Sequence, residues 1–275
     1  FYGHDHDKVG NDLYSATMNP NRGAWLEYET DAANVFYVRI DKNRKLPVTV
    51  LCRALGLSTN EDILNFFGED ERILATLEKD TTKNQDEGLL EVYRKLRPGE
   101  PPTVESATSQ INMLFFDPRR YDLSRFGRYK MNKKLSLARR ITGFVAAENI
   151  VAPLTGEIIV EAKDKITREL AEKADAAGVD TVILSIEGKK VKVITNGCVD
   201  AQGFFSFDVK ECGINERCSF DEIKKILDTT SDVEEQKEML RRNHDQLIGR
   251  TVTVKDILSS INYLNGLGHN IGTTD

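Results

Sequence analysis

Long apolar runs are missing from this sequence of 275 residues. No stretch approaches the roughly 18 consecutive apolar residues that a membrane-spanning helix requires. The start of the chain is polar and aromatic, with no apolar core behind a basic end, so it does not resemble a secretory signal peptide. We therefore expect a cytoplasmic protein with no membrane partner.

Cysteine is scarce, with four residues at Cys52, Cys198, Cys212 and Cys218. No pair has the two-residue spacing of a zinc ribbon, and four cysteines are too few to staple a secreted protein of this size. A bridge between Cys212 and Cys218 is one possibility. The sequence favours the other, reduced and buried thiols in a cytoplasmic protein.

Several catalytic motifs are also absent. The chain has no nucleophile elbow, phosphate-binding glycine loop or dinucleotide fingerprint. It has no Asp-x-Asp-x-Asp cluster that would hold two magnesium ions for nucleotidyl transfer. We therefore expect no self-sufficient active site and no cofactor in this chain. Because it starts at Phe1 without an initiator Met, we also expect it to be an excised piece of a longer protein.

Charge is present in both signs but is unevenly distributed around a net value of −6. Residues 119–140 contain nine Lys or Arg against one Asp, and residues 39–53 contain five against one. Residues 200–245 hold twelve acidic and seven basic side chains. One basic face with an acidic back is typical of a protein that approaches DNA from one side. The alternative is that each run is simply a solvated face.

Alternating runs rich in Tyr, Val, Phe and Trp open the chain and predict antiparallel strands. They cover Leu13–Met18, Ala24–Glu29 and Val35–Ile40. Apolar spacing and capping residues predict helices after Pro47, from a capping box at 58–61, over 87–96 and 103–115, from capping boxes at 219–222 and 231–234, and over 253–264. The predicted fold class is α+β, with mixed helices and antiparallel strands.

The pattern of residue types along the sequence changes near Gly143. Short β-branched runs at 158–160, 181–184 and 191–194 alternate with one helix over Thr167–Ala177, which Gly178 ends. This pattern predicts a small inserted β-rich module. The predicted organisation is one main domain over 1–142 and 244–275, with 143–243 as the inserted module and its acidic helical segment.

His4, His6 and Asp7 form a candidate metal motif near the start of the chain. Imidazole and carboxylate at this spacing resemble the beginning of a metallo-hydrolase motif. That motif requires a further His directly after the Asp, where this chain has Lys8. The interpretation we favour is a solvated hairpin tip without a metal. A zinc hydrolase remains an alternative, which predicts stoichiometric zinc.

Trp25 is the only tryptophan and follows Arg22-Gly23-Ala24. Composition alone favours a core or hydrophobic-face residue on a strand. The functional alternative is a stacking platform for an unpaired base, because the indole lies near a guanidinium and the basic run 39–53.

Four ordered segments resemble the beta subunit of bacterial DNA-dependent RNA polymerase. They are PNRGAWLEYE at 20–29, RIDKNRKLPVTVLCRAL at 39–55, RKLRPGEPPT at 94–103 and DPRRYDLSRFGRYK at 117–130. The resemblance covers residues 1 to about 142 and resumes near His244. It implies the lobe, one jaw of the pincer around downstream DNA, in a nucleotidyltransferase whose catalytic magnesium is held by the beta-prime subunit.

The resemblance also implies partners and site residues. The partners would be the downstream duplex, the non-template strand, the remainder of beta, and the beta-prime, alpha and sigma subunits, in a bacterial cytoplasm near the nucleoid. Trp25 would lie against the non-template strand, and the candidates for phosphate contacts are Arg22, Arg39, Lys42, Arg44 and Lys45. A stand-alone interaction scaffold with a basic face is the alternative function.

The segment from Val151 to about Thr195 resembles a barrel-sandwich insert of large polymerase subunits. In that pattern Lys163 occupies a turn position that is usually Gly. If this turn requires a positive φ, the lysine costs roughly 1 kcal/mol there.

Overall fold

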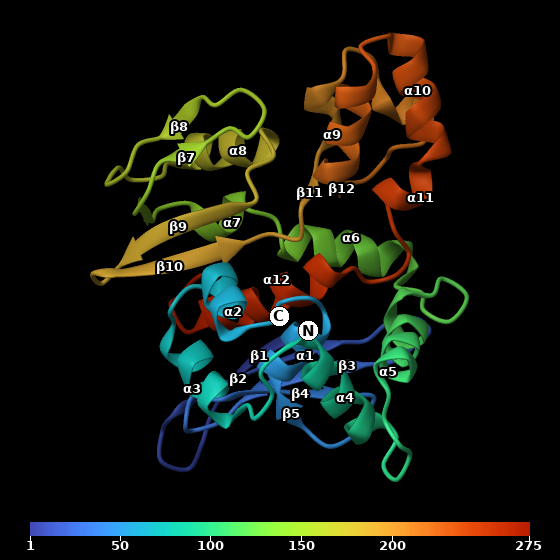
Figure 1. Cartoon of the computed structure of the whole chain (residues 1–275). Helices are drawn as coiled ribbons and strands as arrows, with labels where there is room; N and C mark the ends of the chain where they lie inside the picture. The colour runs from blue at the N-terminus through green and yellow to red at the C-terminus, as the bar shows by residue number, and fades with distance from the viewer. The chain divides into compact units, whose positions relative to one another are not determined.

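The computed structural model describes residues 1–275, which form two compact units. Unit 1 comprises Phe1–Leu123 and Ser260–Asp275, and unit 2 comprises Ser124–Ser259. Each combines helices with antiparallel strands (Figure 1), which confirms the predicted α+β class. The predicted inserted module over 143–243 stays a prediction. None of the helices has both the length and the apolar character needed to cross a membrane.

Unit 1 contains a five-stranded antiparallel sheet whose strands neighbour one another in chain order. The strands are β1 (Tyr2–His6), β2 (Asp12–Met18), β3 (Leu26–Thr30), β4 (Phe36–Ile40) and β5 (Leu46–Pro47). In β3, β4 and residues 13–18 of β2 the even-numbered side chains are buried and the odd-numbered ones are more exposed, as expected when one face of a sheet is covered. The three predicted strands are confirmed.

The helices of unit 1 follow the sheet. They are α1 (Val48–Ala54), α2 (Asn60–Phe67), α3 (Glu71–Lys79), α4 (Gln85–Leu96), α5 (Val104–Ile111), the π-helical turn η1 (Asn112–Phe116) and the C-terminal part of α12 (Val254–Leu267). Helices α1 and α3 pack against β4 and β5. The backbone N–H of Phe36 donates to the buried Thr76 hydroxyl at 2.9 Å, which ties α3 to the sheet.

A buried ion pair lies in the helical layer of unit 1. The Arg53 Nε donates to Asp80 Oδ2 at 3.1 Å, and both side chains are almost fully buried. Asp80 also accepts from the Thr49 hydroxyl at 2.7 Å and from the Thr82 backbone N–H at 2.8 Å. A buried charge is tolerated only when it is paired and hydrogen-bonded in this way.

Helix caps mostly lie where the sequence predicts them, with two shifts of one residue. Thr103 caps α5, and the predicted box at 58–61 is instead formed by Thr59 and Asp62. The box predicted at 231–234 is likewise wrong by one residue, because Asp232 caps α10. Each shift reflects several adjacent Ser, Thr or Asp residues that are equally suited to cap a helix.

Unit 2 has short strands and helices. Its strands are β6 (Val145–Ala146), β7 (Ile150–Val151), β8 (Ile158–Val160), β9 (Thr181–Ile186), β10 (Lys189–Ile194), β11 (Cys198–Val199) and β12 (Cys218–Ser219). Its helices are α6 (Ser124–Lys134), α7 (Ala138–Ile141), α8 (Arg168–Ala176), η2 (Ala201–Phe204), η3 (Val209–Cys212), α9 (Phe220–Thr229), α10 (Val233–Arg242), α11 (His244–Leu247) and the start of α12. The sheets are β10-β9-β6, β7-β8 and β11-β12. None closes into a barrel, so the barrel-sandwich detail stays a prediction.

A buried polar network joins α6 to the start of α12 within unit 2. Arg128 Nη1 donates to both carboxylate oxygens of Asp256, at 3.0 and 2.9 Å. Arg128 Nε donates to the Gly249 carbonyl at 2.9 Å, and Asn196 Nδ2 donates to Asp256 at 2.9 Å and to Asn132 at 3.0 Å. The network therefore provides hydrogen-bond acceptors for the guanidinium of Arg128, a residue that is only 4% exposed.

Lys163 has a positive φ of 77°, as its turn position predicts. The Asp164 N–H donates to the Glu161 carbonyl at 3.1 Å, which makes Lys163 the third residue of a type II turn. A side chain with a Cβ is strained in this conformation.

Replacing Lys163 with Gly should remove this strain, raising the free energy of unfolding by up to about 1 kcal/mol. The control is Lys165→Gly in the same loop, where no positive φ exists and glycine should destabilise. Urea denaturation measures both. Equal destabilisation by the two variants would contradict the strain.

All four cysteines are free, in agreement with the prediction of reduced thiols. Cys52, Cys212 and Cys218 are buried, and Cys198 is partly buried. Burial is the main cause that raises the pKa of Cys198 and of Cys218 to about 12 each. Little thiolate, the reactive species, therefore exists near neutral pH.

Native protein at pH 8 should consequently react with a thiol reagent such as DTNB far more slowly than protein unfolded in guanidinium. Complete reaction in the denatured state should release four thiols per chain. Rapid labelling of the folded chain would contradict the described burial.

Candidate nucleic-acid interface

The odd-numbered residues of β3 and β4 share the more exposed face of the five-stranded sheet, which we call the outer sheet face. Glu27 lies opposite Arg39, and Glu29 lies opposite Tyr37, in the β3–β4 register. Trp25 continues this alternation just before β3, since its carbonyl accepts from the Asp41 N–H at 2.9 Å. Antiparallel pairing thus brings residues from two chain segments together on one face.

Trp25 is half-buried and lies beside a lysine rather than an arginine. The Lys42 Nζ is 5.6 Å from the centre of the indole ring. Asp41 and Lys42 have positive φ values of 53° and 66°, and the Asn43 N–H donates to the Ile40 carbonyl at 3.1 Å. This tight turn directs the Lys42 side chain back over the end of β3. A cation over an indole face is favourable at an exposed site by about 0.5–1 kcal/mol.

Arg39 and Lys45 lie on either side of one carboxylate. Glu29 Oε1 is 3.4 Å from Arg39 Nη2 and 3.8 Å from Lys45 Nζ, and all three side chains are partly exposed. The Lys45 ammonium also lies 4.3 Å from the centre of the Tyr37 ring. These pairs are weak because solvent screens them, so both cations remain available to a stronger anion such as phosphate.

Arg22 is exposed and belongs to a neighbouring loop. Its backbone pairs with Asp122, and its Nη2 donates to the Pro118 carbonyl at 3.3 Å. The next residue, Gly23, has a φ of +121°, and a Cβ there would come within 2.6 Å of the Tyr121 ring. A glycine is thus required where the loop passes Tyr121 to reach Trp25.

The structure therefore groups the predicted site residues into pairs. Trp25 is joined by Lys42, and Arg39 by Lys45, while Arg22 lies on the preceding loop and the exposed Arg44 on the connection to β5. Their role in nucleic-acid binding stays a prediction.

Two further residues of this face were not predicted. Glu29 balances two of the basic residues, and Tyr37 lies beneath Lys45. Burial, with the carboxylates of Asp31 and Glu29 nearby, raises the pKa of Tyr37, so the phenol stays neutral. The two-residue period of the strands would have identified both residues. Tyr37 is two positions from Arg39, and Glu29 is two positions from Glu27, the strand partner of Arg39.

The basic run 119–140 is not a uniform basic face. Arg128 and Arg140 are 4% and 2% exposed and bond inside unit 2. On α6, in contrast, Phe126 and Tyr129 are 66% and 51% exposed, and the Lys130 Nζ lies 5.2 Å from the centre of the Phe126 ring. This helix thus carries a second basic and aromatic surface.

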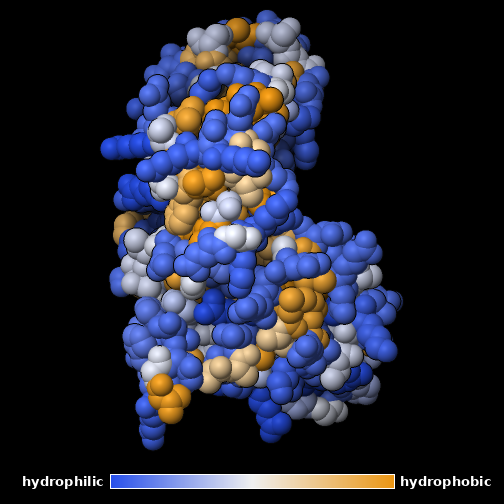
Figure 2. Space-filling view, turned by 90° about the vertical axis from the view of Figure 1, so that its left-hand side faces the viewer, coloured by the Kyte–Doolittle hydropathy of each residue, from blue (hydrophilic) through white to orange (hydrophobic).

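Hydrophobic residues do not dominate the surface on the side shown in Figure 2. That side is mainly hydrophilic, with hydrophobic residues gathered in separate patches.

The solvated hairpin tip predicted for His4, His6 and Asp7 is correct only in part, because Asp7 begins the turn and both histidines are exposed but belong to a strand. His4 and His6 lie within β1, and the tip is the turn that follows. Asp7 instead accepts from the Val9 and Asn11 N–H groups, each at 2.9 Å, and shapes that turn. The carboxylate beside the two imidazoles belongs to Asp12, across the strand pair.

Comparison with known proteins gives one consistent result. The family model for RNA polymerase Rpb2, domain 2, matches residues 1–151. Over the whole chain, the sequence is 55% identical to the DNA-directed RNA polymerase subunit beta of Acetivibrio thermocellus and 50% identical to that of Clostridium novyi. The subunit of Alkaliphilus metalliredigens is 53% identical. The chain spans 22% of the length of each of these relatives.

The pairing around Glu29 predicts a substitution that strengthens nucleic-acid binding. Glu29→Gln should release Arg39 and Lys45, tightening DNA binding by up to about 1 kcal/mol and steepening its salt dependence. Glu91→Gln on α4 removes the same charge from a different ion pair and is the matched control. Fluorescence anisotropy with labelled DNA measures both, and equal affinities for the two variants would contradict the assignment.

Proposed function

Because the chain belongs to the beta-subunit family of DNA-directed RNA polymerases, we propose that it guides DNA during transcription without supplying an active site. The observation that carries this proposal is the outer sheet face, where Trp25 and Lys42 lie next to the Arg39, Glu29 and Lys45 group. It combines exposed positive charge with an aromatic ring, the two features that single-stranded DNA requires.

The proposed grip has an electrostatic part and a stacking part. Arg22, Arg39, Lys42, Arg44 and Lys45 would contact phosphates, which positions a strand without reading its sequence. Displacement of condensed counterions makes this part strongly dependent on salt. Trp25, half-buried and held by β3, would stack on one unpaired base.

Within the whole enzyme, the chain would be the lobe of beta. It would contact the downstream duplex and the non-template strand and assemble with the remainder of beta and with beta-prime, alpha and sigma in the bacterial cytoplasm, near the nucleoid. Nucleotidyl transfer would be a property of that assembly, with the catalytic magnesium in beta-prime. Residues 143–243 would be the inserted, barrel-sandwich-like module.

A protein-interaction scaffold is the second candidate function. The exposed Phe126 and Tyr129 on α6 favour it, because aromatic residues are enriched in protein interfaces. The two functions differ in the surface they use, so substitutions on α6 and on the outer sheet face separate them.

We expect the purified chain to bind DNA weakly, with affinity that falls steeply as salt rises, and to incorporate no nucleotides. Trp25→Ala should weaken binding to single-stranded DNA by about 1–3 kcal/mol with little change in the salt slope, whereas Trp25→Phe should retain most of the affinity. The double variant Arg39→Gln, Lys45→Gln should reduce the slope itself.

Anisotropy titrations of labelled single-stranded and duplex DNA at several salt concentrations measure these effects. Phe126→Ser on α6 is the control for loss of an exposed aromatic ring elsewhere. If it weakens binding as much as Trp25→Ala does, the outer sheet face is not the interface. Nucleotide incorporation by the chain alone would contradict the non-catalytic role.

A further inference from the structure

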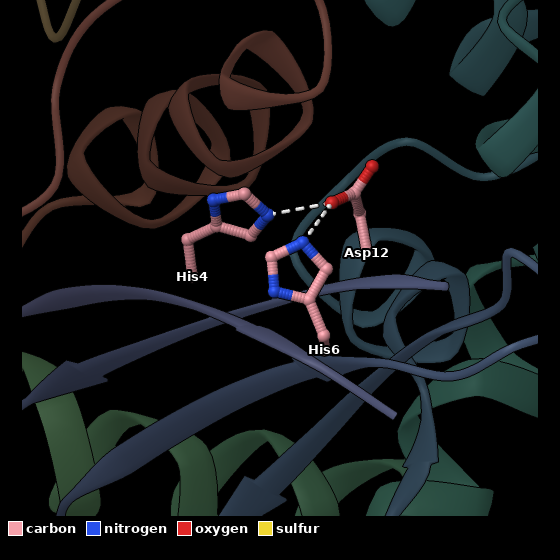
Figure 3. Close-up of side chains that lie close together, drawn as sticks. All are labelled: His4, His6 and Asp12. Atoms are coloured by element: carbon pink, nitrogen blue, oxygen red, sulfur yellow. Dashed lines mark hydrogen bonds and ion pairs between the residues drawn. The ribbon is translucent and has the colours of Figure 1, made fainter. Parts of the chain in front are cut away.

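A cluster of metal-ligating atoms lies at the edge of the five-stranded sheet. His4 and His6 are two residues apart on β1, so their side chains lie on the same face of the sheet. The β1–β2 register places His6 opposite Asp12. Figure 3 shows the two imidazoles directed at the same carboxylate oxygen of Asp12.

The distances between the nitrogen and oxygen atoms of this cluster are close to those between the ligands of a bound metal ion. Asp12 Oδ1 is 2.8 Å from His4 Nε2 and 3.1 Å from His6 Nε2, and the three side chains have ligand atoms within 4.8 Å of one another. Ligand atoms around a tetrahedral zinc ion, at bond lengths near 2.0–2.1 Å, lie about 3.3 Å apart. Small side-chain rotations therefore suffice to admit an ion.

Neighbouring aromatic packing restrains one of the ligands. The His4 ring stacks on the buried Tyr14 ring, with centroids 4.7 Å apart and an interplanar angle of 15°. The Arg72 guanidinium also lies over Tyr14, at 5.1 Å, and its charge opposes a cation nearby. The affinity of such a site would thus come from the imidazole nitrogens and not from an excess of negative charge.

We propose that His4, His6 and Asp12 bind one divalent transition-metal ion of the zinc class. His4 Nε2, His6 Nε2 and one Asp12 oxygen supply three ligands, and water supplies the fourth. Each imidazole carries its proton on Nδ1 when Nε2 binds the ion. Two imidazoles select zinc, cobalt or nickel over magnesium and calcium, which prefer oxygen ligands.

The ion would join β1 to β2 across the edge of the sheet. Because β1 is an edge strand with exposed residues, a cross-strand link there would stabilise the N-terminal hairpin. The site lies on the even-numbered face of the sheet, whereas Trp25 and Arg39 lie on the odd-numbered face. Metal binding is accordingly separable from the proposed DNA contacts.

Titration of the tag-free chain with Zn²⁺ by calorimetry, and with Co²⁺ by visible absorption, tests the proposal. We expect one ion per chain, an intense tetrahedral cobalt band, and a higher melting temperature with zinc. His4→Gln, His6→Gln and Asp12→Asn should each lower the affinity at least tenfold and abolish the zinc-dependent melting shift.

Two variants serve as matched controls. His244→Gln removes a partly exposed histidine of unit 2, and Asp5→Asn removes a carboxylate from the other face of β1. Both should bind zinc like the unmodified chain, and circular dichroism establishes that every variant is folded. Absence of zinc uptake by the unmodified chain would overturn the proposal, as would unchanged binding by the His4, His6 and Asp12 variants.

Discussion

The register of the five-stranded sheet is the constraint on which both candidate sites of unit 1 depend. Pairing of β3 with β4 fixes which side chains face outwards, and pairing of β1 with β2 fixes which side chains meet at the edge. A slip of one residue would move Trp25 and Arg39 to the covered face, because the side-chain period of a strand is two. The burial of alternate residues such as Leu26 and Val38 opposes that slip, since it would expose them.

In the helical regions, two buried arginine–aspartate pairs constrain the packing, as the strand register constrains the sheet. Arg53 and Asp80 lie in unit 1, and Arg128 and Asp256 lie in unit 2, where each guanidinium also donates to backbone carbonyls. Breaking a buried pair by removing one partner costs about 3–5 kcal/mol, because the remaining charge is left uncompensated. The basic side chains of this protein are therefore of two kinds, arginines that are paired in the interior and cations that are exposed at the surface.

This division explains what could be predicted from the sequence. Local signals were sufficient for β2, β3 and β4 and for the Thr103 cap, because each depends on neighbours in the chain. The positive φ of Lys163 was instead suggested by the resemblance, in which this position is usually Gly. They were not sufficient for β1, whose polar residues lack an apolar alternation, or for the burial of Arg128, whose partners lie more than 100 residues away.

The candidate sites, too, depend on contacts between distant residues that the sequence alone does not reveal. The basic residues and Trp25 are evident as a composition, but their grouping around Glu29 and Lys42 follows from cross-strand pairing and a tight turn. The metal motif was assigned to Asp7 because it is adjacent in sequence to His6. Only the β1–β2 register brings Asp12 to the two imidazoles.

We propose above all that the outer sheet face receives single-stranded DNA against Trp25. Since Trp25 is the only tryptophan in the chain, its fluorescence reports on this face alone. Titration with unlabelled single-stranded DNA should quench the emission saturably, at the concentrations where anisotropy of a labelled strand shows binding. Unchanged emission while the anisotropy shows that DNA is bound would contradict the account.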